Sequence, residues 1–83
     1  MNGEAAGADE ASIDCSGLIC PLPVLRARKA LKALPPGGVL RVTATDKAAP
    51  RDFRVWCEEA GHTLLESGEE GGAFVFRIRR GAD

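Results

Sequence analysis

Apolar residues recur at intervals of three and four positions between Val24 and Leu34, and this spacing predicts a helix. We expect the helix to begin at Pro21, because proline favours the first helical turn, where its missing N–H leaves no hydrogen bond unmade. The run Pro35-Pro36-Gly37-Gly38 breaks the pattern and predicts an abrupt end to the helix.

A second stripe of apolar residues at helical spacing follows further along the chain. Its members are Phe53, Trp56, Cys57 and Ala60. Pro50 is suited to the first turn of such a helix, and Gly61 to the left-handed position after its end. The stripe therefore predicts a second helix that starts near Pro50, after a turn, and stops before Gly61.

Four further segments have the alternation or the β-branched composition of strands: 11–14, 39–45, 62–67 and 73–79. In the last of them Phe74, Phe76 and Ile78 share one face, because successive side chains of a strand point to opposite sides. The glycine- and glutamate-rich residues 68–72 are expected to form a loop.

The predicted element order is β-α-β-α-β-β. Right-handed crossovers would place both helices on the same side of the sheet. We therefore expect an α+β fold: a two-layer α/β sandwich in which a four-stranded mixed sheet carries two helices on one face and leaves the other open. Residues 1–10 show no periodicity and are expected to be a flexible N-terminal tail, with residues 11–80 as the domain.

Composition narrows the class of protein. The chain has 83 residues, of which 28% are charged and 45% apolar, which is ordinary for one small globular domain. A domain of this size has no spare core for a deep ligand cavity, so a reactive group on the surface fits better than a pocket enzyme. No apolar run is long enough to cross a membrane, and the N-terminus does not resemble a secretory signal, so we expect a cytoplasmic protein.

Charge argues against a dedicated nucleic-acid binder. Three of the twelve acids lie in the first ten residues, and the rest of the chain holds all eleven Lys and Arg. The domain is therefore only mildly basic, which makes direct nucleic-acid binding unexpected.

The chain has three cysteines, Cys15, Cys20 and Cys57. An odd number does not suit a disulfide framework, and in a reducing compartment we expect free thiols. No Cys or His spacing matches a metal site, so we expect no metal and no cofactor.

Cys20 is the principal candidate for chemistry. It precedes Pro21 and would cap the first helix, where free N–H groups and the helix dipole lower a thiol's pKa. The same groups could hold an anionic persulfide. Pro21 and Pro23 would stiffen this platform, and Ile19 and Leu22 would border the thiol with apolar docking surface. The alternative is that Cys20 is a small buried core residue.

The sequence Asp14-x-x-Gly17-Leu18-x-Cys20-Pro21-x-Pro23 resembles the signature of the TusA (SirA-like) sulfurtransferase family. The resemblance covers residues 13–80. It continues through Arg28-Lys29-Ala30-Leu31, Gly38, Thr45-Asp46, Arg51-Asp52, Trp56-Cys57, Gly61-His62 and Phe74-x-Phe76-x-Ile78.

This resemblance implies a β-α-β-α-β-β sandwich and a sulfur carrier with little turnover of its own. Cys20 would accept sulfur as a persulfide from a cysteine desulfurase or rhodanese and relay it to an acceptor protein. The destination would be tRNA thiolation, molybdenum cofactor assembly or another sulfur pathway. Members concerned with tRNA thiolation have Glu between the two prolines, where this chain has Leu22, so the acceptor stays open.

Several side chains are assigned supporting or docking roles around Cys20. Pro21, Pro23, Asp14, Gly17, Arg28 and Lys29 are expected to support the thiol, and Ile19, Leu22, Arg26, Lys32 and Asp46 to contact partners. The basic residues of the first helix form either plain solvated surface or a patch that steers an acidic partner.

The remaining candidates have structural explanations. Asp14 is expected to fix the loop before Cys20, and Asp46 and Asp52 to serve the start of the second helix. Cys57 is expected in the core, and His62 in a structural role. Cys15 is either structural or a resolving thiol that closes a disulfide with Cys20.

Two rival functions remain open. A small RNA-binding module would use arginines on or near the strands: Arg41, Arg77, Arg79 and Arg80. A redox-regulatory protein would use oxidation of Cys20, alone or with Cys15.

Overall fold

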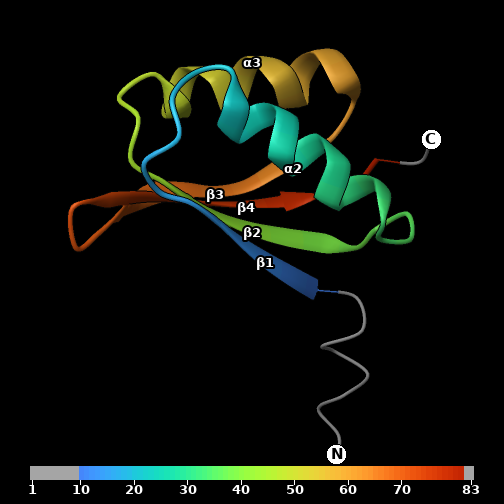
Figure 1. Ribbon diagram of the computed structural model, residues 1–83. Helices are drawn as coiled ribbons and strands as arrows, with labels where there is room; N and C mark the ends of the chain where they lie inside the picture. Colours follow the sequence, from blue (N-terminus) through green and yellow to red (C-terminus); the bar gives the residue numbers. More distant parts are fainter. Residues whose placement is uncertain (1–9, 82–83) are drawn as a thin grey trace, which may run out of the picture.

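Both helices lie on one face of a four-stranded sheet (Figure 1). The structure is a computed structural model and describes residues 10–81. The elements are β1 (Glu10–Cys15), α2 (Leu22–Lys32), β2 (Val39–Ala44), α3 (Ala49–Ala60), β3 (Thr63–Glu70) and β4 (Ala73–Arg79). The predicted element order and fold class are confirmed. The tail expected at residues 1–10 lies outside the described residues, except Glu10, which begins β1.

The strands lie in the order β1-β2-β4-β3. β1 and β2 are parallel, so α2 must cross over the sheet between them. β4 pairs antiparallel with both β2 and β3, which makes the sheet mixed. This topology brings the carboxyl ends of β1 and β2 side by side, through the pair Cys15 and Ala44. The loops that follow these two strands therefore start next to each other.

The helices follow the predicted signals with one shift. α2 begins at Leu22, one residue later than expected, and Pro21 occupies the N-cap. In α3, Pro50 lies in the first turn as predicted. Gly61 ends α3 in the left-handed conformation, with φ of 80°, and its N–H donates to the Cys57 carbonyl at 3.0 Å. Glycine adopts this conformation without the steric cost that a Cβ would bring.

β3 is longer than its composition suggests. It extends to Glu70, so the loop predicted at residues 68–72 is wrong for its first three positions, and only Gly71 and Gly72 form the turn. Both turn glycines have positive φ. Cross-strand pairing with β4, which runs to the pair Glu70 and Ala73, overrides the weak strand propensity of this segment.

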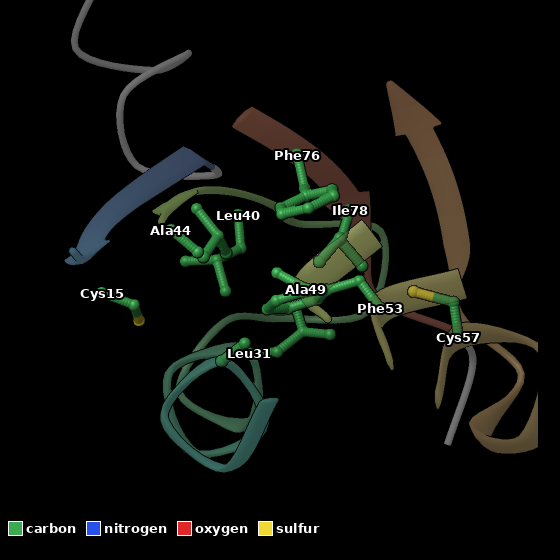
Figure 2. Close-up of a cluster of buried hydrophobic side chains, with 11 residues drawn as sticks. Cys15, Leu31, Leu40, Ala44, Ala49, Phe53, Cys57, Phe76 and Ile78 are labelled. Atoms are coloured by element: carbon green, nitrogen blue, oxygen red, sulfur yellow. The ribbon is translucent and has the colours of Figure 1, made fainter. Parts of the chain in front are cut away.

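The core lies between the helices and the sheet (Figure 2). Its fully buried members are Cys15, Ala27, Leu31, Leu40, Val42, Ala44, Ala49, Phe53, Cys57, Phe76 and Ile78. Phe53 of α3 stacks on Phe76 of β4 with ring centroids 4.6 Å apart, and Trp56 meets Phe53 edge-on at 6.1 Å. The core assignment of Cys57 is confirmed, and Cys15 is buried as well.

The open face of the sheet carries paired charges. Arg41 pairs with Glu70 at 3.2 Å, and Arg77 with Glu66 at 3.2 Å and with Glu10 at 3.6 Å. Arg41 and Arg77, two of the four arginines that an RNA-binding role would use, are therefore ion-paired with glutamates. This pairing weakens the RNA-binding alternative, because phosphate contacts would have to displace those acids. Within residues 10–81, neither helix has the length and apolar character that a membrane crossing needs.

Replacing Phe53 by alanine removes the ring that joins α3 to the sheet. We expect Phe53→Ala to lower the free energy of unfolding by about 3–5 kcal/mol, because it opens a cavity in a site that is fully buried. Chemical denaturation followed by circular dichroism measures the loss. The neighbouring Arg54 is exposed, and Arg54→Ala should change stability by no more than about 0.5 kcal/mol. Equal losses in both variants would contradict this description of the core.

Candidate functional site

Cys20 is the one exposed thiol among the three cysteines. Cys15, at the end of β1, is 1% exposed, and Cys57, in α3, is 2% exposed. Burial also raises the pKa of both: for Cys15 it is the leading cause, and for Cys57 it raises the value to about 11. Buried thiols with raised pKa values are poor nucleophiles. Reactive thiol chemistry in this molecule is therefore confined to Cys20, and the resolving role considered for Cys15 loses support.

Hydrogen bonds fix the loop that carries Cys20, residues 16–21. At its start, Asp14 accepts from the Ser16 N–H at 3.0 Å and from the Ser16 hydroxyl at 2.6 Å. Gly17 has φ of 82°, and its N–H donates to the Thr45 hydroxyl at 2.9 Å. These contacts turn the chain sharply at the end of β1.

The same loop is tied to the segment between β2 and α3. The Cys20 N–H donates to the Asp46 carboxylate at 3.1 Å. Sequence analysis placed Asp46 at partner contacts and at the start of the second helix. Its side chain caps no helix N–H; Ala48 occupies the N-cap of α3, and no side-chain cap bond is present there. Asp46 instead holds the backbone of the reactive cysteine.

The expectation that Cys20 caps the helix is wrong, because Pro21 takes the N-cap. The first turn also has few N–H groups to offer a sulfur anion. Pro21 and Pro23 have none. The Leu22 N–H already donates to the Ile19 carbonyl at 2.8 Å. The helix start therefore serves to position Cys20 rather than to cradle an anion.

The predicted lowering of the Cys20 pKa is also wrong. A hydrogen bond to the Asp52 carboxylate is the largest influence and raises the pKa of the thiol. Desolvation and the charges of Asp52 and Asp46 raise it further, and the Arg51 guanidinium lowers it in part. At rest, two carboxylates thus favour the protonated thiol. Asp52 lies thirty-two positions along the chain, in the first turn of α3, and only the packing of the helices brings it to Cys20.

An open groove adjoins the thiol. Its walls come from both helices: Cys20, Pro21, Val24, Arg51, Asp52, Val55, Trp56 and Glu59. On the outer side the apolar rim continues as Ile19, Leu22 and Leu25, which are 68%, 43% and 49% exposed. Apolar side chains this exposed on a small protein commonly mark a contact surface. The apolar side chains expected to border the thiol, Ile19 and Leu22, are therefore exposed, as is Leu25 in the first turn of α2.

The basic residues of α2 are spread around the helix rather than gathered at the thiol. Arg26 acts electrostatically on Cys15. Arg28 and Lys32 line the groove further from Cys20, and Lys29 is exposed near the end of the helix. The cation that acts on Cys20 is Arg51. Sequence analysis did not single out Arg51, and its only signal was the place of Arg51-Asp52 in the family resemblance.

Residues 10–81 contain no group of three or more His, Cys, Asp and Glu side chains placed to hold a metal ion. The site offers one accessible thiol on a loop held by hydrogen bonds, with a carboxylate that accepts a hydrogen bond from it and exposed apolar side chains nearby. Such a thiol can attack a sulfur atom presented by another protein.

Comparison with known proteins gives a consistent result. The family model described as "Sulfurtransferase TusA" matches residues 11–80. The "Sulfur carrier protein TusA" of Allochromatium vinosum is 50% identical over 68 residues, which cover 82% of this chain and 90% of the relative. The protein of the same name from Pseudomonas aeruginosa is 42% identical over 74 residues, covering 89% and 94%. A crystal structure of a SirA-like protein from Desulfitobacterium hafniense superposes with a TM-score of 0.75 at 32% identity, covering 86% and 97%.

Replacing Asp52 by asparagine removes the charge that favours the protonated Cys20 thiol. We expect Asp52→Asn to lower the pKa of Cys20 toward its ordinary value, so that more thiolate is present at neutral pH. The rate of alkylation by iodoacetamide, followed across pH, should rise severalfold near neutrality, and its midpoint should move to lower pH.

Glu58→Gln is the matched control, because it removes one negative charge from an exposed position of the same helix that does not line the groove at Cys20. Its alkylation profile should stay close to that of the unchanged protein. Equal effects of the two variants, or slower alkylation of Asp52→Asn, would show that Asp52 does not control the thiol.

Proposed function

Because the chain belongs to the TusA family of sulfurtransferases and is a sulfur carrier protein, we propose that Cys20 is the residue that carries the sulfur, as a persulfide. The observation that supports this choice is exposure: Cys20 is accessible, and the other two thiols are buried. Its rigid loop and apolar rim suit transfer between protein surfaces, which requires a fixed nucleophile that a partner can approach.

The transfer proceeds by thiolate attack. Cys20 gives up its proton, and its sulfur attacks the terminal sulfur of a persulfide on a donor protein. A new S–S bond forms at Cys20, the S–S bond of the donor breaks, and the donor cysteine leaves as a thiolate. In the second half, an acceptor thiolate attacks the terminal sulfur of the Cys20 persulfide, and the Cys20 thiolate is regenerated. No net oxidation or reduction takes place.

Asp52 affects both the empty and the loaded state of Cys20 in this cycle. Its hydrogen bond favours a protonated thiol at rest, which limits unwanted reactions of Cys20. A persulfide is more acidic than a thiol and is ionised near neutral pH. The charges of Asp52 and Asp46 would destabilise that anion, and Arg51 would offset them in part. The loaded carrier is therefore ready to give its sulfur away.

The carrier role implies contact with a sulfur donor and a sulfur acceptor protein. We assign the donor to the cysteine desulfurase or rhodanese type, which hold sulfur as a persulfide. Ile19, Leu22 and Leu25 supply the apolar contacts, and the basic residues of α2 steer acidic partners. The exchange belongs to a reducing compartment such as the cytoplasm, where thiols stay free.

The supporting residues divide by task. Asp14 and Gly17 shape the loop, and Asp46 holds the backbone of Cys20. Pro21 and Pro23 restrict the start of α2, and the burial of Pro23 anchors that start to the core. Leu22, between the prolines, stands in the apolar rim and is the position at which we expect acceptor choice to be set.

Intact-protein mass spectrometry tests the assignment of Cys20. After incubation with a cysteine desulfurase and cysteine, or with a rhodanese and thiosulfate, we expect an adduct of one sulfur atom that reducing agent removes. Cys20→Ser should lose the adduct completely. Cys15→Ser and Cys57→Ser, checked for folding by circular dichroism, should keep it, because both positions are buried. An adduct that persists in Cys20→Ser would overturn the assignment.

A further inference from the structure

The groove at Cys20 is the first part of a longer groove between α2 and α3. Two further hollows continue it toward the far ends of the helices. All three hollows share Trp56 and Glu59, and each has a volume of roughly 300 to 380 Å³. They therefore form one continuous surface depression that starts at Cys20 and ends near Lys32.

The middle of the groove is largely apolar, with Arg28 and Glu59 as its two charged side chains. Val24 and Leu25 from α2 face Trp56 from α3 across it, and Leu25 is 49% exposed. The Trp56 ring is fixed by contact with Phe53 on one side and with His62 on the other, with ring centroids 6.1 and 5.2 Å apart. An apolar side chain of a partner would find a preformed wall here, at little cost in ordering.

The far end of the groove is positively charged. Arg28, Lys32 and Arg80 line it, and Glu59 is the one acidic side chain in its lining. Arg80 is held in place, because its guanidinium donates to the Leu34 carbonyl. His62 accepts from the Gly81 N–H at 2.9 Å through Nδ1, so its proton lies on Nε2 and makes that atom a donor. The three cations at this end of the groove favour a carboxylate over a neutral group, because a charge-assisted hydrogen bond is stronger than a neutral one.

The length of the groove sets the size of its occupant. From Leu22 to Lys32, α2 rises about 15 Å, at about 1.5 Å per residue. An extended chain advances about 3.3 Å per residue, so about four or five residues span that distance. A segment whose cysteine meets Cys20 would place the residue four or five positions away at Arg28 and Lys32.

We propose that this groove binds an extended segment of the sulfur-transfer partner, with its cysteine at Cys20, an apolar residue against Trp56 and a carboxylate four or five positions away at Arg28 and Lys32. The inference rests on the proposed function, and it adds the chemistry by which a partner is recognised. The groove is open and half apolar, which suits a peptide better than a small anion, and Asp52 and Glu59 make it a poor site for a phosphate-rich surface.

Disulfide exchange with short peptides tests the proposal. Each peptide carries a cysteine that is activated as a mixed disulfide with thionitrobenzoate. The Cys20 thiolate attacks the peptide sulfur, a disulfide between Cys20 and the peptide forms, and thionitrobenzoate leaves as a thiolate. The absorbance of the released thionitrobenzoate gives the rate. The first peptide has Leu in the middle and Asp four positions after the cysteine, and its twin has Asn in place of that Asp. A second Asp and Asn pair has the same residues in reverse order, so that both directions of the bound chain are tested. At low salt the Asp peptide of one pair should react roughly twofold to fivefold faster than its Asn twin, as one or two exposed ion pairs allow.

The variants separate a specific site from general charge attraction. Lys32→Glu and Arg28→Glu should abolish the preference for Asp. Arg54→Glu changes the net charge by the same amount at an exposed position of α3 outside the groove, and should keep the preference. A peptide with Asp adjacent to cysteine should gain nothing over its Asn twin.

Equal rates for Asp and Asn peptides in both chain directions would overturn the proposal, as would an equal loss of preference in Arg54→Glu and Lys32→Glu. Sulfur uptake by Cys20 is measured on the same samples. Normal sulfur uptake without a preference for Asp overturns the proposed role of the groove and leaves the proposed function standing. Absent sulfur uptake overturns the proposed function itself.

Discussion

The hydrogen bond from the Cys20 N–H to the Asp46 carboxylate determines the position of everything else at the site. It joins two loops that the parallel pairing of β1 and β2 brings to the same edge of the sheet. With the loop held there, the thiol lies against the first turn of α3, where it hydrogen-bonds to Asp52. The Gly17 N–H, three residues before Cys20, donates to the hydroxyl of Thr45, the residue before Asp46, and repeats this tie. Two hydrogen bonds therefore fasten the Cys20 loop to the segment that follows β2.

That position gives the thiol a chemistry unlike that of a typical reactive cysteine. Many reactive cysteines are activated by nearby cations or by a helix N-terminus. Here a carboxylate accepts a hydrogen bond from the protonated thiol, and the two prolines remove N–H groups from the helix start. A carrier does not need the most nucleophilic thiol. In the proposed cycle it needs a sulfur bond that forms when a donor is docked and breaks when an acceptor is docked, and the carboxylates near Cys20 would place a mild electrostatic penalty on the loaded form.

The fold was predictable from the sequence because each element carries a local signal. The period of the apolar residues, the prolines at both helix starts and Gly61 were sufficient to place α2 and α3 to within a few residues. The end of β3 was not predictable, because its pairing with β4 depends on a neighbour and not on its own composition. At the candidate site, the exposure of Cys20 and of the apolar residues beside it agrees with what the sequence predicted. Asp52 was missed as a thiol partner, since only the packing of α3 against α2 brings it there. Its hydrogen bond to Cys20 raises the pKa of the thiol, where a position at the helix N-cap was expected to lower it.

The edge strand β3 has features that hinder pairing with another chain. An unpaired strand edge is a template on which other chains can add a strand. In β3 the irregularity between Leu64 and Glu66, and the acids Glu66, Glu69 and Glu70, obstruct such addition. On the neighbouring open face, Arg41 and Arg77 already pair with glutamates, so a charged partner would have to displace those glutamates. The acids of β3 and the ion pairs of the open face therefore make these two surfaces poor places for a partner to dock, whereas the exposed apolar rim lies on the side of the molecule that carries Cys20.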